Sequence, residues 1–198
     1  HSIEKQTAKF ADAFTTVSDI TARECQELLD KPCDVVLPNG FENDFVAKGA
    51  AFTKKRKEAR KKIFQIANCL LGETFSDDTL VIGTSGRYEY RNKGIDVYLE
   101  SLKQLATSNL NRDVLAIVAV PAGINGVRED LVKHLADSNN AIDPSQKRYL
   151  THRLEAEAWD QVSQSIEGSI LSTNASRVKV LFVPTYLNGN DGLFNISY

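Results

Sequence analysis

The stretch Asp113-Val114-Leu115-Ala116-Ile117-Val118-Ala119-Val120 is an almost continuous apolar run. A short strand that is apolar on both faces is typical of the interior of a parallel sheet, because helices cover both sides of such a sheet. Residues 79–83 and 177–183 are also short, apolar and rich in β-branched side chains. We therefore expect strands at 79–83, 113–120 and 177–183.

The segments around these strands show helical spacing. Apolar residues recur three or four positions apart in 94–106 and 127–137, so we expect helices there. We expect a longer helix to begin at Asp143-Pro144 and to run through Ile166. Residues 121–126 are expected to form a loop. Trp159 and Tyr149 fall in that longer helix, where packing is favoured over stacking on a sugar. Alternating strands and helices predict an α/β fold with a Rossmann-like parallel sheet.

The first 40 residues read as the end of another unit of the same kind. We expect a helix over 1–11, a strand over 13–17, a helix over 19–29 capped by Ser18 and Asp19, and a strand over 33–37. An amphipathic helix follows over 50–71 and is closed by Gly72. Its basic run, 54–62, is either a nucleic-acid or membrane patch or a solvated helix face, and the overall charge favours the solvated face.

Composition sets further bounds. The chain has 198 residues, 42% of them hydrophobic and 25% charged, with a formal net charge of −2. These values exclude a globally basic nucleic-acid binder, and no apolar run reaches the length of a membrane span. Three cysteines without C-x-x-C spacing predict reduced, buried thiols in a cytoplasmic protein, and no spacing predicts a metal site. Because methionine is absent and the first residues read as mid-helix, we expect a piece of a longer protein.

One loop differs from its surroundings: Gly83-Thr84-Ser85-Gly86-Arg87-Tyr88-Glu89-Tyr90-Arg91-Asn92-Lys93-Gly94-Ile95-Asp96. It follows a strand and precedes a helix, where open α/β sheets bind ligands. Arg87 can clamp phosphate oxygens in a bidentate manner, Lys93 adds a point charge, and the helix start is expected to supply free N–H groups. It is neither a P-loop nor a G-x-G-x-x-G fingerprint. The segment is thus a phosphate-binding loop or a polar surface loop.

Four ordered blocks carry a resemblance. Arg87 to Asp96 is similar to the R-Y-E-F-x-N-K-G-x-D segment of the eukaryotic-type glycogen synthases, and Phe14 to Ala22 resembles their F-T-T-V-S-x-I-T-A. Lys31 to Gly40 is similar to K-P-D-x-x-x-P-N-G with Cys33 added, and Ser176 to Val180 resembles a late R-V-K-V strand. Together the blocks span most of the chain.

The resemblance implies a GT-B fold, which has two Rossmann-like domains. It implies a retaining transfer of glucose from UDP-glucose, a nucleotide sugar, to an α-1,4-glucan acceptor without metal or cofactor. On that template, residues 1–40 close the first domain with a hinge at Asn39 and Gly40. Residues 41–75 form an amphipathic linker region, and residues 76–198 begin the nucleotide-sugar-binding domain.

The resemblance also implies roles for single residues. Arg87 and Lys93 would bind the donor diphosphate, with Gly86, Asn92 and Gly94 as the supporting loop. The catalytic carboxylates, an E-x7-E pair, would lie beyond Tyr198, so no catalytic residue is expected within the chain and this piece is expected to be inactive. Residues 183–187 depart from the histidine- and glutamate-bearing family segment, so no nucleoside contact is carried over there.

Other interpretations remain open. A noncatalytic nucleotide- or sugar-binding module would keep the loop without the chemistry, and a related transferase could use another donor or acceptor. His152 and His134 are expected to be structural. If residues 1–38 lack a native partner, their apolar faces are expected to be exposed, and the chain to self-associate.

Overall fold

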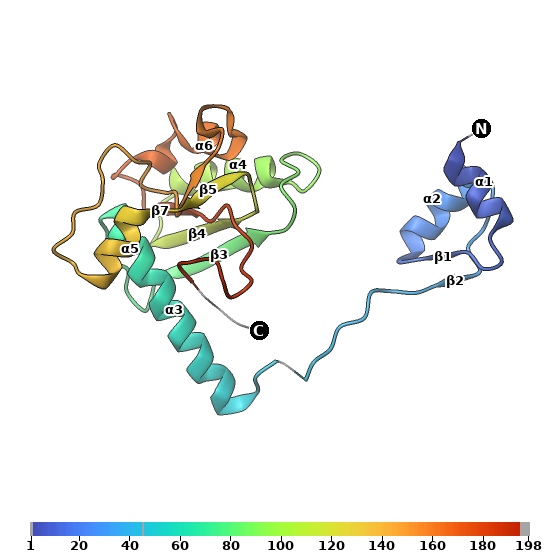
Figure 1. Cartoon of the computed structure of the whole chain (residues 1–198), viewed down its shortest axis with the longest axis horizontal. Helices are drawn as coiled ribbons and strands as arrows, with labels where there is room; N and C mark the ends of the chain where they lie inside the picture. The colour runs from blue at the N-terminus through green and yellow to red at the C-terminus, as the bar shows by residue number, and fades with distance from the viewer. Residues whose placement is uncertain (1, 45, 195–198) are drawn as a thin grey trace. The chain divides into compact units, whose positions relative to one another are not determined.

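The computed structural model describes residues 2–44 and 46–194. The chain forms two compact units, His1–Ala47 and Lys48–Tyr198. The order of their helices and strands can be followed in Figure 1. Each unit alternates helices with parallel strands, which confirms the predicted α/β class.

The first unit is a small helix–strand–helix–strand motif. It contains α1 (Ile3–Phe10), β1 (Thr15–Thr16), α2 (Asp19–Leu29) and β2 (Val35–Val36), and the two strands pair in parallel. Of the two predicted capping residues, Ser18 is confirmed, because its side chain accepts a hydrogen bond of 3.2 Å from the N–H of Thr21, whereas Asp19 is the first residue of the helix. These elements agree closely with the predicted ones, since each boundary is encoded locally.

This unit leaves apolar side chains in water. Helix α2 contributes no buried residue, and its Ile20 and Leu28 are 70% and 73% exposed. Ile3 and Phe10 of α1 are exposed as well. The predicted exposure of apolar surface in residues 1–38 is therefore confirmed.

The second unit is built on a three-stranded parallel sheet in the order β3–β4–β7, with β5 and β6 forming a separate antiparallel pair. The elements in chain order are α3 (Gly49–Leu71), β3 (Leu80–Ser85), α4 (Ile95–Ala106), β4 (Val114–Ala119), β5 (Ile124–Val127), α5 (Glu129–Ala136), β6 (His152–Leu154), η1 (Glu157–Trp159), α6 (Gln161–Ile166), η2 (Ile170–Ser172) and β7 (Val178–Phe182).

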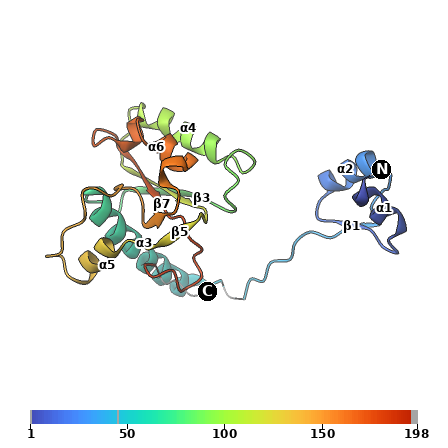
Figure 2. The ribbon, with the colours of Figure 1, turned by 45° about the horizontal axis from the view of Figure 1, so that its top comes forward.

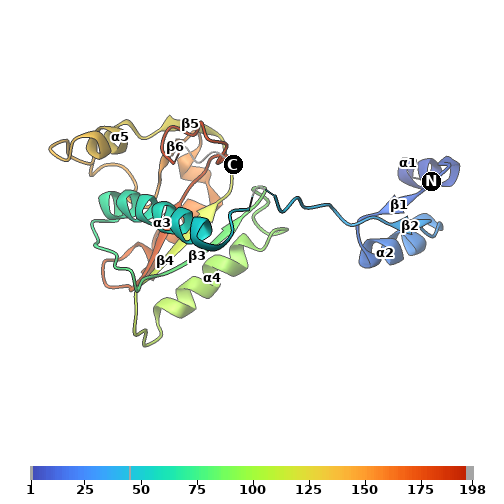
Figure 3. The ribbon, with the colours of Figure 1, turned by 90° about the horizontal axis from the view of Figure 1, so that it is seen from below.

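Helices cover both faces of this sheet, so its central strand is apolar on both sides. Figure 2 shows α4 and α6 on one side, and α3 and α5 on the other; Figure 3 shows α3 and α4 on opposite sides of the strands. Alternate residues of β4 face the two layers: Val114, Ala116 and Val118 pack with α4, whereas Leu115 packs with α3. The two-sided burial predicted for 113–120 is confirmed.

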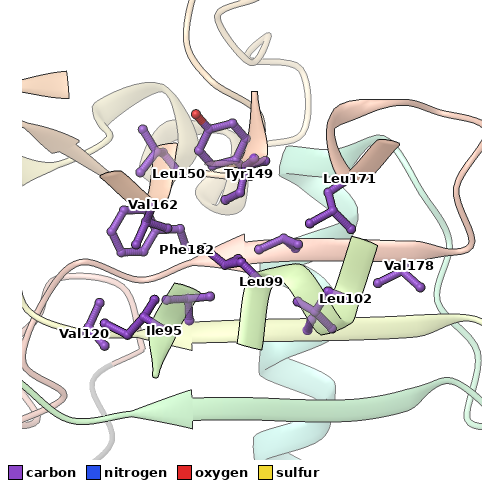
Figure 4. Packing of buried hydrophobic residues seen from close by; sticks show 14 of the residues in the cluster. Ile95, Leu99, Leu102, Val120, Tyr149, Leu150, Val162, Leu171, Val178 and Phe182 are labelled. Carbon is purple, nitrogen blue, oxygen red and sulfur yellow. The ribbon is translucent and has the colours of Figure 1, made fainter. Parts of the chain in front are cut away.

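The larger core lies between the sheet and α4. Leu99 and Leu102 of α4 pack against Phe182 and Val178 of β7, and Val162 of α6 closes the cluster (Figure 4). Tyr149 is buried in the same cluster, as predicted, and its hydroxyl donates to Glu167. These contacts fix the carboxyl ends of the strands relative to the helices that follow them.

The first half of α3 is exposed all round, including Lys54, Lys55, Arg56 and Lys57. The basic run predicted at 54–62 is thus exposed there, as both a solvated face and a binding patch require, and the solvated face stays a prediction. Arg60 differs, because its guanidinium donates to the carbonyl oxygens of Asp77 and Thr79 and lies 4.6 Å from the ring centroid of Phe64. The second half of α3 belongs to the core of the second unit.

The long helix expected over 143–166 was wrong. Residues 152–154 form β6, and only 161–166 are α-helical. The four-residue spacing of Leu150 and Leu154 matches a helix, but both side chains are buried from an extended segment in which Leu150 bridges Phe182 of β7. Pairing between residues distant in sequence has overridden the local pattern. The loop expected at 121–126 likewise contains the start of β5.

Candidate functional site

The turn after β3 begins with a glycine that the backbone requires. Gly86 has φ of 145°, a conformation that other residues rarely adopt, and a Cβ placed there would meet no atom within 4 Å. The chain then passes through residues 87–93 and enters α4 after Gly94, which has φ of 65°. The two glycines thus set where the turn leaves the sheet and where it becomes helical.

A pocket of about 590 Å³ lies at the carboxyl edge of the sheet. Its walls come from the ends of all three parallel strands: Ser85, Gly86 and Arg87 after β3, Ala119 and Pro121 at the end of β4, and Thr185, Tyr186, Leu187 and Asn188 after β7. We call it the Arg87 pocket. Ligands of open α/β sheets bind at this edge, where loops from neighbouring strands converge.

Arg87 is the cation of this pocket. Its side chain is 75% exposed, and its Nε lies 3.1 Å from Oε1 of Glu89. An exposed ion pair of this kind contributes at most about 1 kcal/mol, so a more highly charged ligand can displace it. The guanidinium can therefore present two N–H groups to phosphate oxygens in the pocket.

The other residues predicted for this site lie further along the same turn. Asn92 and Lys93 are exposed, and the N–H of Lys93 donates to the carbonyl oxygen of Glu89. Asn92, Lys93 and Gly94 are not among the residues that line the Arg87 pocket. The structure thus brings Arg87 and Gly86 together with the ends of the three strands, and leaves Lys93 on the adjoining turn.

The expectation that the start of α4 supplies free N–H groups was wrong. The N–H groups of Ile95 and Asp96 both donate to the carbonyl oxygen of Tyr90, and that of Val97 donates to the Asp96 carboxylate. The turn folds back so that its own oxygens satisfy the helix start. The N–H groups of Ile95, Asp96 and Val97 are therefore not free to bind an anion.

Tyr88 points away from the Arg87 pocket and anchors the turn. Its hydroxyl donates to Oδ2 of Asp160 at 2.6 Å and accepts from the N–H of Val162 at 3.1 Å. Burial, and then the hydrogen bond to the Asp160 carboxylate, raise the pKa of Tyr88, so it remains a donor at neutral pH. Sequence reasoning did not find this link, because Asp160 is distant along the chain.

His152 and His134, which were expected to be structural, both have hydrogen-bond partners. His152 is buried on β6, with Nδ1 2.9 Å from Oγ1 of Thr151 and Nε2 3.1 Å from the carbonyl oxygen of Asp191. Burial lowers its pKa, which keeps the ring neutral. His134 lies on α5, and its ring bonds the carbonyl oxygen of Asn140.

The cysteines differ from expectation. Cys25, Cys33 and Cys69 are free but only partly buried, and Cys69 packs against the core beneath α3. Within residues 2–44 and 46–194, no group of three His, Cys, Asp or Glu side chains is arranged to hold a metal ion. No helix in the same ranges is long and apolar enough to cross a bilayer.

Asn39 and Gly40, predicted as a hinge, lie in the first unit after β2, where the backbone forms no regular element. Both are exposed, and a Cβ on Gly40 would meet nothing within 4 Å. The chain there is free of packing constraints, which is compatible with the predicted role.

Both units contain residues that match a known protein family. The family described as glycogen synthase matches residues 1–148, which include both the first unit and the turn that carries Arg87. The chain belongs to the glycogen synthase family.

Curated relatives agree with this membership. Glycogen [starch] synthase isoform 2 of Saccharomyces cerevisiae is 35% identical over all of this chain and 37% of its own length. The Neurospora crassa glycogen [starch] synthase is 30% identical, covering 90% of this chain and 27% of its own, and the liver glycogen [starch] synthase of Homo sapiens is 26% identical. The chain spans roughly a third of the length of these glycogen synthases.

The yeast alignment also shows a difference in length within the matched region. It extends over 265 positions, which exceeds the 198 residues of this chain. The yeast synthase therefore carries residues inside this region that the present chain lacks.

Proposed function

We propose that the second unit is the donor-binding part of a glycogen synthase-like glycosyltransferase that moves glucose from UDP-glucose to an α-1,4-glucan with retention. One observation carries the proposal. Arg87, which opens the family-like block Arg87–Asp96, lines a pocket formed by the ends of β3, β4 and β7. A cation at that edge suits a nucleotide-sugar diphosphate.

In this proposal, Arg87 and Lys93 both bind the diphosphate. The planar guanidinium of Arg87 bonds two oxygens, and the ammonium of Lys93, exposed on the adjoining turn, adds a second positive charge. Both charges stabilise the departing nucleoside diphosphate, where negative charge develops during transfer. Gly86, Asn92 and Gly94 shape the supporting turn.

We further propose a division of the chain into domains. Residues 1–40 would close a first Rossmann-like domain with its hinge at Asn39 and Gly40, and residues 76–198 would form the donor domain with 41–75 leading into it. We assign no catalytic carboxylate to the chain, so by itself it would bind the donor without turnover. Three free cysteines support a cytoplasmic location.

A competition experiment tests the donor. Calorimetric titration with UDP, UDP-glucose and ADP-glucose should show binding of both uridine compounds, with ADP-glucose at least about tenfold weaker. Tighter binding of ADP-glucose would assign a different donor, and no binding of any of the three would contradict a donor site. Donor binding without any transfer to glycogen, including in a version extended to the length of the related synthases, would favour the noncatalytic module.

Self-association is a separate proposal from the same chain. The exposed apolar side chains of α1 and α2, among them Ile3, Phe10, Ile20 and Leu28, would bring two copies together. Light scattering at high concentration should show a mass above that of the monomer, and Ile20→Lys with Leu28→Glu should reduce it. A monomer at every concentration would contradict the proposal.

A further inference from the structure

A second pocket, of about 540 Å³, lies beside the Arg87 pocket and shares no residue with it. Tyr88 and Gly123 contribute from the segments after β3 and β4, and Glu155, Trp159 and Asp160 contribute from the stretch between β6 and α6. Two consecutive residues line different pockets: Arg87 lines the Arg87 pocket, and Tyr88 lines the second one. We call it the Trp159 pocket. Its volume is in the range of small-molecule sites, about 300–1,000 Å³.

The wall of the Trp159 pocket is held in place before any ligand arrives. Tyr88 bonds Asp160 and the N–H of Val162, and the other oxygen of Asp160 accepts from the N–H of Ser163 at 2.7 Å. The Tyr88 ring also meets the Phe182 ring edge-on, with centroids 6.4 Å apart. A ligand would therefore meet an ordered surface, which lowers the entropy cost of binding.

Trp159 was expected to pack inside a helix, but its side chain is 81% exposed at the rim of this pocket. It lies on the short helix η1, which follows an extended segment rather than a helical one. The indole presents a broad apolar face to water, although such a ring gains free energy when it is covered. Such a face beside a pocket is a platform for a flat, amphipathic ligand.

The charges of the Trp159 pocket select against phosphate. Glu155 and Asp160 are its charged residues, and no Lys, Arg or His is among the residues that line it. The Glu155 carboxylate lies over Gly123, where an added Cβ would come within 2.6 Å of Oε2. Carboxylates accept hydrogen bonds from hydroxyl groups but repel anions. A neutral ligand with many hydroxyl groups and an apolar C–H face fits both features.

We propose that the Trp159 pocket binds a segment of a neutral α-1,4-linked glucan, with Trp159 stacking on a sugar ring and Glu155 accepting from sugar hydroxyls. Asp160 is mainly a positioning residue, since its oxygens already hold Tyr88 and Ser163. The choice of an α-glucan rests on the proposed function. The site would hold an acceptor chain next to the donor loop. The Arg87 pocket would offer a positive charge to the donor, and the Trp159 pocket would offer carboxylates to the acceptor.

The experiment uses the only tryptophan of the chain as its reporter. Titration with maltoheptaose should change Trp159 fluorescence saturably, with a millimolar or tighter dissociation constant, whereas the β-linked cellohexaose should act more weakly. By calorimetry, Trp159→Ala should weaken maltoheptaose binding at least about tenfold, Trp159→Phe less so, and Gly123→Ala should weaken it by displacing the Glu155 carboxylate.

Controls separate this proposal from the donor site. Arg87→Ala should leave maltoheptaose binding unchanged, and Trp159→Ala should leave UDP binding unchanged. A saturable fluorescence response to UDP in place of maltoheptaose would overturn the carbohydrate assignment, as would maltoheptaose binding that survives Trp159→Ala. If UDP fails to bind while maltoheptaose still does, the donor proposal fails and the carbohydrate pocket stands.

Discussion

The Tyr88 hydroxyl and the Asp160 carboxylate lie 2.6 Å apart although 72 positions separate them in the chain. This hydrogen bond ties the turn that carries Arg87 to the segment that carries Trp159. One residue, Tyr88, therefore forms the back of one pocket while its neighbour Arg87 lines the other. The geometry of both pockets depends on it.

Tyr88→Phe should destabilise the second unit. Removing the hydroxyl leaves Oδ2 of Asp160 and the N–H of Val162 without this partner in a half-buried position. We expect a loss of about 1–3 kcal/mol in the free energy of unfolding. Urea unfolding followed by circular dichroism measures it, because Trp159 is already exposed in the folded state. An unchanged free energy of unfolding would argue against the link.

Tyr98→Phe is the matched control variant, and it should not lower the free energy of unfolding. The Tyr98 hydroxyl is buried in α4 without a hydrogen-bond partner among the described residues. Its removal should leave stability unchanged or raise it by up to about 1 kcal/mol, because an unpaired buried polar atom carries a desolvation cost. If both variants lose the same stability, the hydroxyl of Tyr88 has no special role.

Tyr98 also makes a prediction for alkaline pH. Burial raises its pKa to about 12, whereas an unfolded chain has a tyrosine pKa of about 10. Above pH 10 the unfolded state therefore binds fewer protons than the folded state, and stability falls as pH rises toward 12. The free energy of unfolding should decline less steeply in Tyr98→Phe than in the parent chain, and an identical decline would contradict the assignment.

Arg128 clamps the loop before β6. Its side chain is 1% exposed, its Nε and Nη2 bond both carboxylate oxygens of Asp130, and its Nη1 donates to the carbonyl oxygens of Lys147 and Leu150. Burial raises the pKa of Asp130, but the hydrogen bonds from Arg128 and the N–H of Asp143 outweigh it, so the net pKa is lowered. Arg128→Met should cost about 3 kcal/mol, because it removes the cation from a partly buried carboxylate and leaves the carbonyl oxygens of Lys147 and Leu150 without this donor.

The control for Arg128 is an exposed arginine. Arg153→Met removes one hydrogen bond, from the guanidinium to the carbonyl oxygen of Asn125, in an exposed position. It should cost less than about 1 kcal/mol. Equal effects of the two substitutions on urea unfolding would show that burial of Arg128 does not matter.

His152 predicts a loss of stability under mild acid. Because its folded pKa is lowered by burial, the unfolded chain takes up a proton first, at about pH 6.5. The stabilising effect is present above pH 6.5 and is lost as pH falls from there toward the folded pKa. The free energy of unfolding measured between pH 7.5 and 5 should fall in the parent chain and vary less in His152→Gln. The same slope in both would exclude His152 as the cause.

The sequence predicted those elements whose signals are local. The helix at 19–29 has its Ser18 cap, the helix ending at Leu71 has Gly72 after it with φ of 67°, and the central strand is a continuous apolar run. Strand β6 was missed because it depends on pairing with Val127, 25 positions away, and on the bridge between Leu150 and Phe182. Four-residue spacing alone could not reveal that pairing.

The candidate site was predictable in part for the same reason. Arg87 stands in a local motif between a strand and a helix, so its place at the sheet edge followed from sequence. The opposite wall, residues 185–188, comes from β7 and was not carried over from the family. Trp159 was misplaced because its exposure depends on a short turn whose position is set by β6. Contacts between residues distant in the sequence thus set the parts of the site that local propensity does not determine.

The most direct test of the central claim compares two arginines of the same turn. Arg87 lines the pocket, whereas Arg91 is exposed and occupies a position that the family-like block leaves unspecified. UDP binding measured by calorimetry should weaken about 10- to 100-fold in Arg87→Ala, the loss expected of a charge-assisted hydrogen-bonded pair, and remain within about twofold of the parent in Arg91→Ala. Equal binding of UDP by the parent chain and Arg87→Ala would contradict a donor diphosphate at this edge of the sheet.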